Sequence, residues 1–512
     1  MLTNIRISPV LCAACGAALA YYCLFPLYRS GAFSINALLI LAFIPVGFLS
    51  LFRALDSWPL KVATPQTVRL LRLLPSRLTA FAAGVALGIG FGTNAVQSVS
   101  FGIPEDTVQG INGVLLDDPR IISGGRAMAT LSLKMISGKG NVRVGARGDI
   151  VVFFPEESAG RLKEFGRGTE VYAEGVLREG VRSFGGGSDS TYLFSADALH
   201  ITRQAPQIER FRTGLRMDIA YRFTESPSGD PQWGGLALAM LVGIRDNLDA
   251  GFAVLYRDSG CAHILALSGM HLAVLVAIIS FLLKKPLGLR PAAVTGAVII
   301  LAYCYIVGPL PGLNRSALMY LLGVMAVLGM LKRAPLSILC MAFLLQLAMT
   351  PRAGFSLSFI LSYMALAGIL IVGESLNDLF KGKIPAFLLL SLSASAGAFL
   401  ATAGVVAEVF SVLRPVGILS GLVLTPLTTL FMIGSIIWLI LNVLAPSLSP
   451  LLSYPLSMLY ALMEKVASAA GKIPGMTLAP RLALVLSLLL IILILWLDCR
   501  SRLIRNRLEP FA

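Results

Sequence analysis

Long apolar segments with few charges recur along this 512-residue chain and restrict its fold more than any other feature. About twelve of them approach the roughly 20 residues that an α-helix needs to cross a lipid bilayer. Only 13% of the residues are charged, about half of the share in an ordinary soluble domain. The sequence therefore predicts a polytopic α-helical membrane protein. The expected spans are 9–28, 33–52, 79–100, 262–283, 291–309, 313–331, 335–350, 353–373, 385–408, 416–443, 450–470 and 480–497.

Basic residues predict how these spans are oriented. Residues 101–235 hold 16 lysines and arginines against 17 acidic residues, whereas the rest of the chain holds 26 against 10. The basic excess therefore belongs to the membrane part, where basic loops usually stay in the cytoplasm. We expect both termini in the cytoplasm, provided that 233–258 dips into the membrane without crossing it. The basic segments on that side are 53–78, 284–285, 332–333, 381–383 and the tail 500–512.

Between the third and fourth spans the pattern changes to alternating apolar and polar residues, which is typical of β-strands. A short helix is expected at 156–165, and three strands, a helix and two strands is the order of an OB-fold barrel. We therefore expect an extracytoplasmic OB-like domain at 101–205. Disulfides are not expected there, because 101–232 contains no cysteine. The expected strands are 107–116, 127–136, 149–154, 169–179 and 191–201.

The rest of the chain divides around this domain. Residues 1–100 are expected to form a three-span N-terminal segment. Residues 206–232 contain four arginines and are expected to form an amphipathic linker helix on the membrane surface. Residues 233–499 then make up a larger membrane domain. Within it, Pro426 is expected to break its span, because proline lacks the backbone donor that a helix interior needs.

Ionisable residues concentrate in 243–271, within or beside apolar sequence. Such groups are costly at membrane depth, so they usually pair with one another or line a water-filled path. Alternatively, 245–258 forms a helix on the outer surface with its charges in water, and the two histidines of the segment serve in packing. With two residues from later spans, the candidate channel-lining residues are Arg245, Asp246, Arg257, Asp258, His263, Ser268, Gly269, His271, Arg315 and Ser362.

The stretch 256–271, YRDSGCAHILALSGMH, closely resembles the core motif of the ComEC-type competence protein family, the DNA-uptake channel of the bacterial inner membrane. Segments 243–245, 315–319, 361–370 and 415–426 resemble further motifs of that family. Three N-terminal spans followed by an OB-like domain also match its architecture. The residues that match the core motif are Gly260, Ala262, His263, Ala266, Ser268, Gly269 and His271, whereas Ile244, Ile360 and Gly421 depart from the family's other motifs.

The resemblance implies a channel that passes single-stranded DNA into the cytoplasm during natural transformation. It also implies partners: single-stranded DNA, the lipid bilayer and other competence proteins (a DNA receptor, a cytoplasmic translocase and a single-strand-binding protein), with a homo-oligomer as a further expectation. No enzymatic activity, cofactor or metal site is expected. Many family members carry a metallo-β-lactamase-like nuclease domain, which needs an HxHxDH cluster. This chain has three histidines and ends at Ala512, so the form without that domain is expected.

Under this hypothesis the OB-like domain receives the strand at the outer mouth of the channel. OB folds hold single strands with basic side chains on phosphates and aromatic rings under bases. The DNA-binding candidates are Arg143, Arg147, Phe153, Phe154, Tyr172 and Arg178.

Two other functions stay open. An intramembrane serine hydrolase would use Ser268 and His271, which lie three residues apart and so share one helical face, although no GxSxG surrounds the serine. A channel or scaffold for another polar polymer or envelope component would need no contact with DNA. The nearly neutral external domain favours this second alternative.

Overall fold

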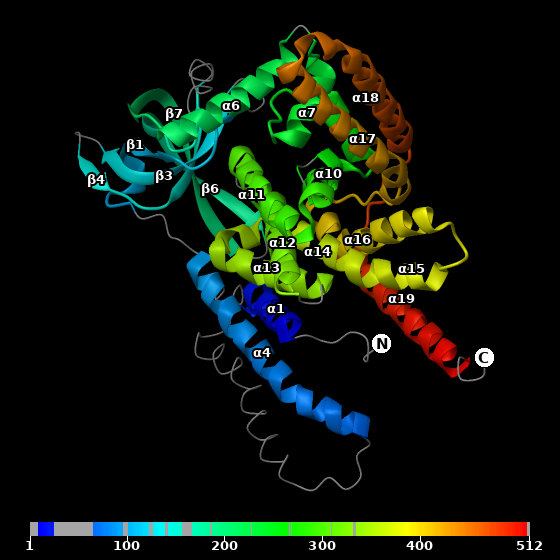
Figure 1. Ribbon diagram of the computed structural model, residues 1–512. Coiled ribbons are helices and arrows are strands. Elements are labelled where there is room, and N and C mark those ends of the chain that lie inside the picture. Colours follow the sequence, from blue (N-terminus) through cyan, green and yellow to red (C-terminus); the bar gives the residue numbers. More distant parts are fainter. Residues whose placement is uncertain are drawn as a thin grey trace.

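The computed structural model describes residues 9–24, 65–95, 101–121, 126–138, 142–155, 166–184, 187–226, 228–265, 267, 269–308, 310–330 and 334–508. Figure 1 shows a β-barrel at one side of a large helical assembly, with one long helix, α6 (Gln207–Thr224), leading from the barrel to the other helices. The expected span 33–52 and the expected short helix 156–165 lie outside the described residues.

Two N-terminal helices pack against each other through small residues. α1 covers Pro9–Leu19 and continues into a π-helical turn, η1, at Ala20–Leu24, and α4 covers Pro65–Ala95. A Cβ atom on Gly84 would collide with the backbone of α1, so the close approach requires glycine there. The basic segment 53–78 was expected to be a loop before the span 79–100, but α4 already begins at Pro65, in a stretch rich in leucine and arginine. Proline suits the first turn of a helix, and leucine and arginine favour its interior.

Five strands close into a barrel, with β5 and β7 paired in parallel and every other neighbouring pair antiparallel. Around the ring the order is β1, β3, β5, β7, β6 and back to β1. Alternate side chains point inward and form an apolar core, as the period-two pattern predicts. All five expected strands are confirmed, and the last two are longer than predicted. The strands are β1 (Val108–Leu115), β3 (Ala127–Gly138), β5 (Asp149–Phe154), β6 (Glu170–Phe184) and β7 (Gly187–Arg203), and the short β2 (Arg120–Ile121) and β4 (Arg143–Gly145) pair with β3.

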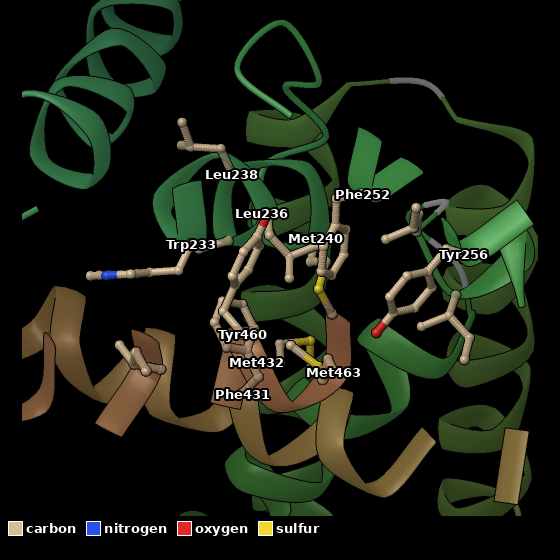
Figure 2. Packing of buried hydrophobic residues seen from close by; sticks show 14 of the residues in the cluster. Trp233, Leu236, Leu238, Met240, Phe252, Tyr256, Phe431, Met432, Tyr460 and Met463 are labelled. Atoms are coloured by element: carbon tan, nitrogen blue, oxygen red, sulfur yellow. The ribbon is translucent and has the colours of Figure 1, made fainter. Parts of the chain in front are cut away.

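The largest apolar core among the described residues joins segments that are far apart in the sequence. In Figure 2, side chains from α7, α8, α17 and α18 lie close together, with Met240, Tyr460 and Met463 among them. The rings of Phe252 and Tyr460 stack with their centroids 4.6 Å apart. α7 is buried from Trp233 to Met240, which explains how an apolar segment too short to cross a membrane is shielded from water. The bounds are α6 (Gln207–Thr224), α7 (Pro231–Leu241), α8 (Ala250–Asp258), α17 (Gly417–Leu444) and α18 (Pro450–Gly471).

Six of the described helices are long and apolar enough to cross a membrane. They comprise α10 (Gly269–Leu287), α11 (Leu289–Val307), the run Leu357–Phe380, α16 (Ala386–Phe410), α17 and Pro480–Arg502 of α19 (Pro480–Leu508). Shorter apolar helices include α12 (Pro311–Leu328) and α13 (Pro335–Met349), and the run from residue 357 combines α14 (Leu357–Gly368), η4 (Ile369–Gly373) and α15 (Glu374–Phe380). The chain is therefore a helical membrane protein with a β-barrel domain.

Two predictions about individual spans are wrong. The expected span 262–283 is divided, because a short helix α9 (Ala262–Leu265) precedes α10, which starts at Gly269. Glycine costs less at the first position of a helix than in its interior. α17 also continues through Pro426, whose exposed side chain points away from the neighbouring helices. A membrane helix tolerates proline where local adjustments satisfy the freed backbone groups.

Candidate functional site

The first half of the 256–271 motif forms the end of α8 and the turn after it. The amide of Cys261 donates to the carbonyl of Tyr256 (2.9 Å), and the amide of Gly260 donates to that of Arg257 (3.1 Å). These two bonds define a helix end of the Schellman type, which needs a left-handed residue after the cap. Gly260 supplies it with a φ of 77°. The glycine of the motif is therefore required by backbone geometry.

This turn is fixed to the N-terminal end of α17. A Cβ atom on Gly260 would lie 2.8 Å from the Cα atom of Gly417, so the two backbones are in direct contact. The Ser420 hydroxyl donates to the carbonyl of Ser259 (2.7 Å), and its oxygen lies 3.2 Å from the sulfur of Cys261. The segments 256–261 and 415–426, which were recognised separately in the sequence, therefore form one structural unit.

An arginine outside the predicted set secures the same turn. Arg414 donates from Nη1 to the carbonyl of Asp258 (2.7 Å) and from Nη2 to its carboxylate (3.1 Å). The side chain of Arg257 contacts the same carboxylate at 3.3 Å but is 66% exposed. Asp258 is thus held in an ion pair at the surface of the turn, and Arg257 extends away from it. The only sequence signal for Arg414 was a lone charge between two apolar spans.

The second half of the motif contacts α12. A Cβ atom on Gly269 would lie 2.9 Å from Nη2 of Arg315 and 2.5 Å from Oγ of Ser316. Arg315 is 7% exposed, and His271, two residues into α10 after Gly269, is 2% exposed. The structure thus brings Gly269, His271 and Arg315 into one buried region where α10 and α12 begin.

Polar contacts extend from Arg315 to residues of α14 and α13. Its guanidinium carbon lies 5.8 Å from the ring centre of Tyr363, and the Tyr363 hydroxyl donates to Oε1 of Gln346 (2.8 Å). Gln346 is 2% exposed. Ser362, the predicted residue on α14, is half-buried beside Tyr363. Tyr363 and Gln346 escaped the prediction, because an aromatic residue and a glutamine within apolar helices are also typical of packing.

The remaining channel-lining candidates from residues 243–271 lie elsewhere. Arg245 and Asp246 have exposed side chains in the loop between α7 and α8. His263 on α9 is exposed, and Ser268 lies outside the described residues.

The barrel candidates divide by exposure. Arg143, Arg147 and Arg178 are exposed, and Phe153 and Tyr172 are half-buried. Phe154 is fully buried in the barrel core, so its ring cannot stack on a base, and its selection as a contact is wrong. The alternation of β5 gives the physical reason, because neighbouring residues point to opposite faces of a strand.

Two of the four arginines of α6, Arg212 and Arg216, face the neighbouring helices, whereas Arg210 is exposed. Arg212 is 2% exposed and donates from Nη2 to the carboxylate of Asp118 (2.5 Å) and from Nε to the carbonyl of Tyr305 (3.0 Å). Arg216 donates to the carbonyls of Val242 (3.1 Å) and Val307 (2.7 Å). These carbonyls end α7 and α11, where helices carry unpaired acceptors and a partial negative charge. We call Arg212 and Arg216 the α6 clamp.

The clamp also determines the charge of Asp118. Burial alone would raise the pKa of its carboxyl group, but the hydrogen bond from Arg212 and the charges of Arg216 and Arg212 outweigh burial and lower the pKa overall. A second ion pair joins Asp149 of the barrel to Arg352 (2.5 Å), which lies in the 3-10 turn η3 (Pro351–Phe355). The barrel is therefore attached to the membrane helices at two charged points.

Residues 240–501 match the family model described as Competence protein. The chain belongs to the competence protein family. The matched region contains the contacts described above between the 256–271 motif, Arg315 and 414–420. The barrel precedes it.

Two curated proteins are similar to this chain over shorter stretches. An uncharacterized protein of Aquifex aeolicus (strain VF5) is 31% identical over 218 residues, which cover 42% of this chain and 50% of the relative. ComE operon protein 3 of Bacillus subtilis (strain 168) is 26% identical over 173 residues, which cover 33% of this chain and 22% of the relative. The similarity thus spans half or less of the length of these relatives.

Proposed function

We propose that this protein is a channel of the bacterial inner membrane that passes single-stranded DNA into the cytoplasm during natural transformation. The observation that carries the proposal is that three segments with separate family motifs, 256–271, 315–319 and 415–426, contact one another in the structure. Gly260 contacts Gly417, and Gly269 contacts Arg315, within the region that matches the family. The other competence proteins named above, and the lipid bilayer, would be its partners.

The barrel would receive the strand. Its strand order, with a parallel pair between the third and fifth main strands, supports an OB-type assignment. OB folds bind ligands through the face of their second and third strands and the adjoining loops. In this chain Asp118, in the loop after the first strand, pairs with Arg212 of α6, and Asp149, at the start of the third strand, pairs with Arg352 of η3. This arrangement supports transfer of a strand from the barrel directly to the helices.

Surface residues of the barrel would provide the first contacts. Arg143, Arg147 and Arg178 would bind phosphates, and Phe153 and Tyr172 would lie under bases. Such binding should weaken steeply with salt, because each neutralised phosphate releases a counterion. In the membrane part, Arg245, Arg315 and the histidines of the motif would line the path. The expected topology of about twelve spans, with both termini in the cytoplasm and the domain boundaries given above, belongs to the same proposal.

Transformation frequency in the host tests the proposal. A clean deletion should abolish transformation, and wild type should restore it. His271→Ala should fail to restore it at a membrane protein level equal to wild type. His200→Ala, which alters an exposed histidine on β7 outside the motif, serves as the matched control and should restore transformation. An unchanged frequency after deletion in a demonstrably transformable host would refute DNA import and favour a channel for another polymer.

A further inference from the structure

Arg315 is a buried cation whose described surroundings do not balance its charge. Among the residues with described positions, its Nε and Nη1 atoms have no hydrogen-bond partner, and none of the ion pairs includes it. The face of the Tyr363 ring, 5.8 Å away, offsets part of the charge. A guanidinium buried among apolar helices is costly without an anionic or hydrogen-bonded counterpart. Among the described residues, these two donors therefore lack the counterpart that an anion would supply.

The first turn of α10 meets this guanidinium. α10, α11 and α12 follow one another through short turns, so α10 and α12 run in the same direction and begin at the same end. The side chain of a helical residue leans toward the N-terminus of its helix, which directs Arg315 toward that end of α12. Glycine at position 269 allows Nη2 of Arg315 to lie where a larger residue would place its Cβ atom, 2.9 Å away.

Both features favour the same kind of ligand. The N-terminal end of a helix carries a partial positive charge, and its backbone amides bind phosphate and sulfate groups. A guanidinium matches two oxygens of such a group at once. Without an anion, the helix end and the guanidinium would repel each other at this distance. The contact between them is therefore the arrangement expected of an oxyanion site.

The site lies on the barrel side of these helices. The α6 clamp holds the carbonyls of Ile306 and Val307 at the end of α11, and α12 begins four residues after Val307. Arg315 is in the second turn of α12. A negatively charged chain that leaves the barrel would therefore meet the clamp region first and Arg315 next.

We propose that Arg315, Ser316 and the first turn of α10 form a binding site for a phosphate-class oxyanion. If the protein carries single-stranded DNA, as proposed above, the bound oxyanion is a phosphodiester group of the transported strand. Arg315 would provide the paired donors and α10 the partial charge of its N-terminus. Ser316, whose hydroxyl donates to the carbonyl of Gly312 (3.0 Å), would line the wall.

Thermal unfolding of the purified full chain in detergent tests the site. Inorganic phosphate should raise the melting temperature of wild type relative to chloride at matched ionic strength, and single-stranded oligothymidylate should do the same. Arg315→Gln should weaken both effects about tenfold or more in affinity, since hydrogen bonds between charged groups are lost. Arg315→Lys should retain part of them. Arg290→Gln, which alters an exposed arginine near the other end of α11, is the matched control.

The melting temperature without phosphate separates this site from a merely structural role. Arg315→Gln should leave it unchanged or raise it, because the substitution removes an unbalanced buried charge. A marked fall, with the phosphate response unchanged, would overturn the site. Stabilisation by phosphate but not by oligothymidylate would overturn the phosphodiester as its ligand. None of these results depends on DNA import, so a failed import role and a failed site are distinguishable.

Discussion

Nη2 of Arg212 lies 2.5 Å from Oδ2 of Asp118, although the two residues are 94 positions apart. The contact joins a loop of the barrel to α6, and through the carbonyls of α11 it joins both to the membrane helices. Arg212 is buried and Asp118 is partly shielded, so the pair is protected from the screening that weakens surface ion pairs. The barrel is therefore expected to be held in place rather than to swing freely on a linker.

Arg212→Met should destabilise the junction between barrel and membrane part. Loss of one partner of a buried ion pair leaves the other uncompensated, which typically costs about 3–5 kcal/mol. Thermal unfolding in detergent should show a clear fall in melting temperature. Arg210→Met, two positions earlier on the exposed side of α6, is the control and should have little effect. Equal melting temperatures for the two variants would contradict a clamp at this position.

The stability of the same junction should fall when the pH becomes acidic. The pKa of Asp118 in the folded protein lies below its unfolded value of about 3.9. The stability that its charge contributes is therefore fully present above that value and is lost as the pH falls through the lowered folded pKa. Proteolysis at α6 by an acid-active protease should accelerate across that acidic range in wild type. In Asp118→Asn it should be fast throughout, and a parallel pH profile in both proteins would refute this origin.

Gly260→Ala should disrupt the turn between α8 and α17. The left-handed backbone costs a residue with a Cβ atom about 1–2 kcal/mol, and here the new atom also meets the backbone of Gly417. We expect a lower melting temperature and reduced transformation. Gly323→Ala is the matched control on α12, where nothing lies within 4 Å of the added atom. That change should stabilise its helix slightly, by about 0.5–1 kcal/mol.

Arg414→Gln should be more harmful than Arg257→Gln, although only Arg257 belongs to the recognised motif. Arg414 makes two hydrogen bonds to Asp258, each worth about 1.5–3 kcal/mol when one group is charged. Arg257 is largely exposed, and exposed ion pairs contribute about 0–1 kcal/mol. Melting temperature and transformation frequency, measured on both variants at equal expression, check the ranking. A more severe loss in Arg257→Gln would instead indicate direct contact with the transported molecule.

Local patterns in the sequence were sufficient for the elements themselves. Alternation located all five barrel strands, because a half-buried strand must present one apolar face. Apolar length located α11, α16 and α17 to within a few residues, because a bilayer accepts only segments that satisfy their own backbone. The family was also evident from 256–271, because seven residues of this stretch match its core motif.

Tertiary structure decided which charged side chains are paired. The arginines of α6 looked like a polar face for the membrane surface, yet Arg212 and Arg216 turn inward, because helix ends far along the chain present unpaired carbonyls to them. The contributions of Arg257 and Arg414 to stability could be compared only in the structure, which shows that the Asp258 carboxylate faces Arg414. Phe154 became a core residue when the barrel closed around it. Burial and ion pairing are properties of groups that meet in space, so the order of residues determines the elements and only the fold determines these partners.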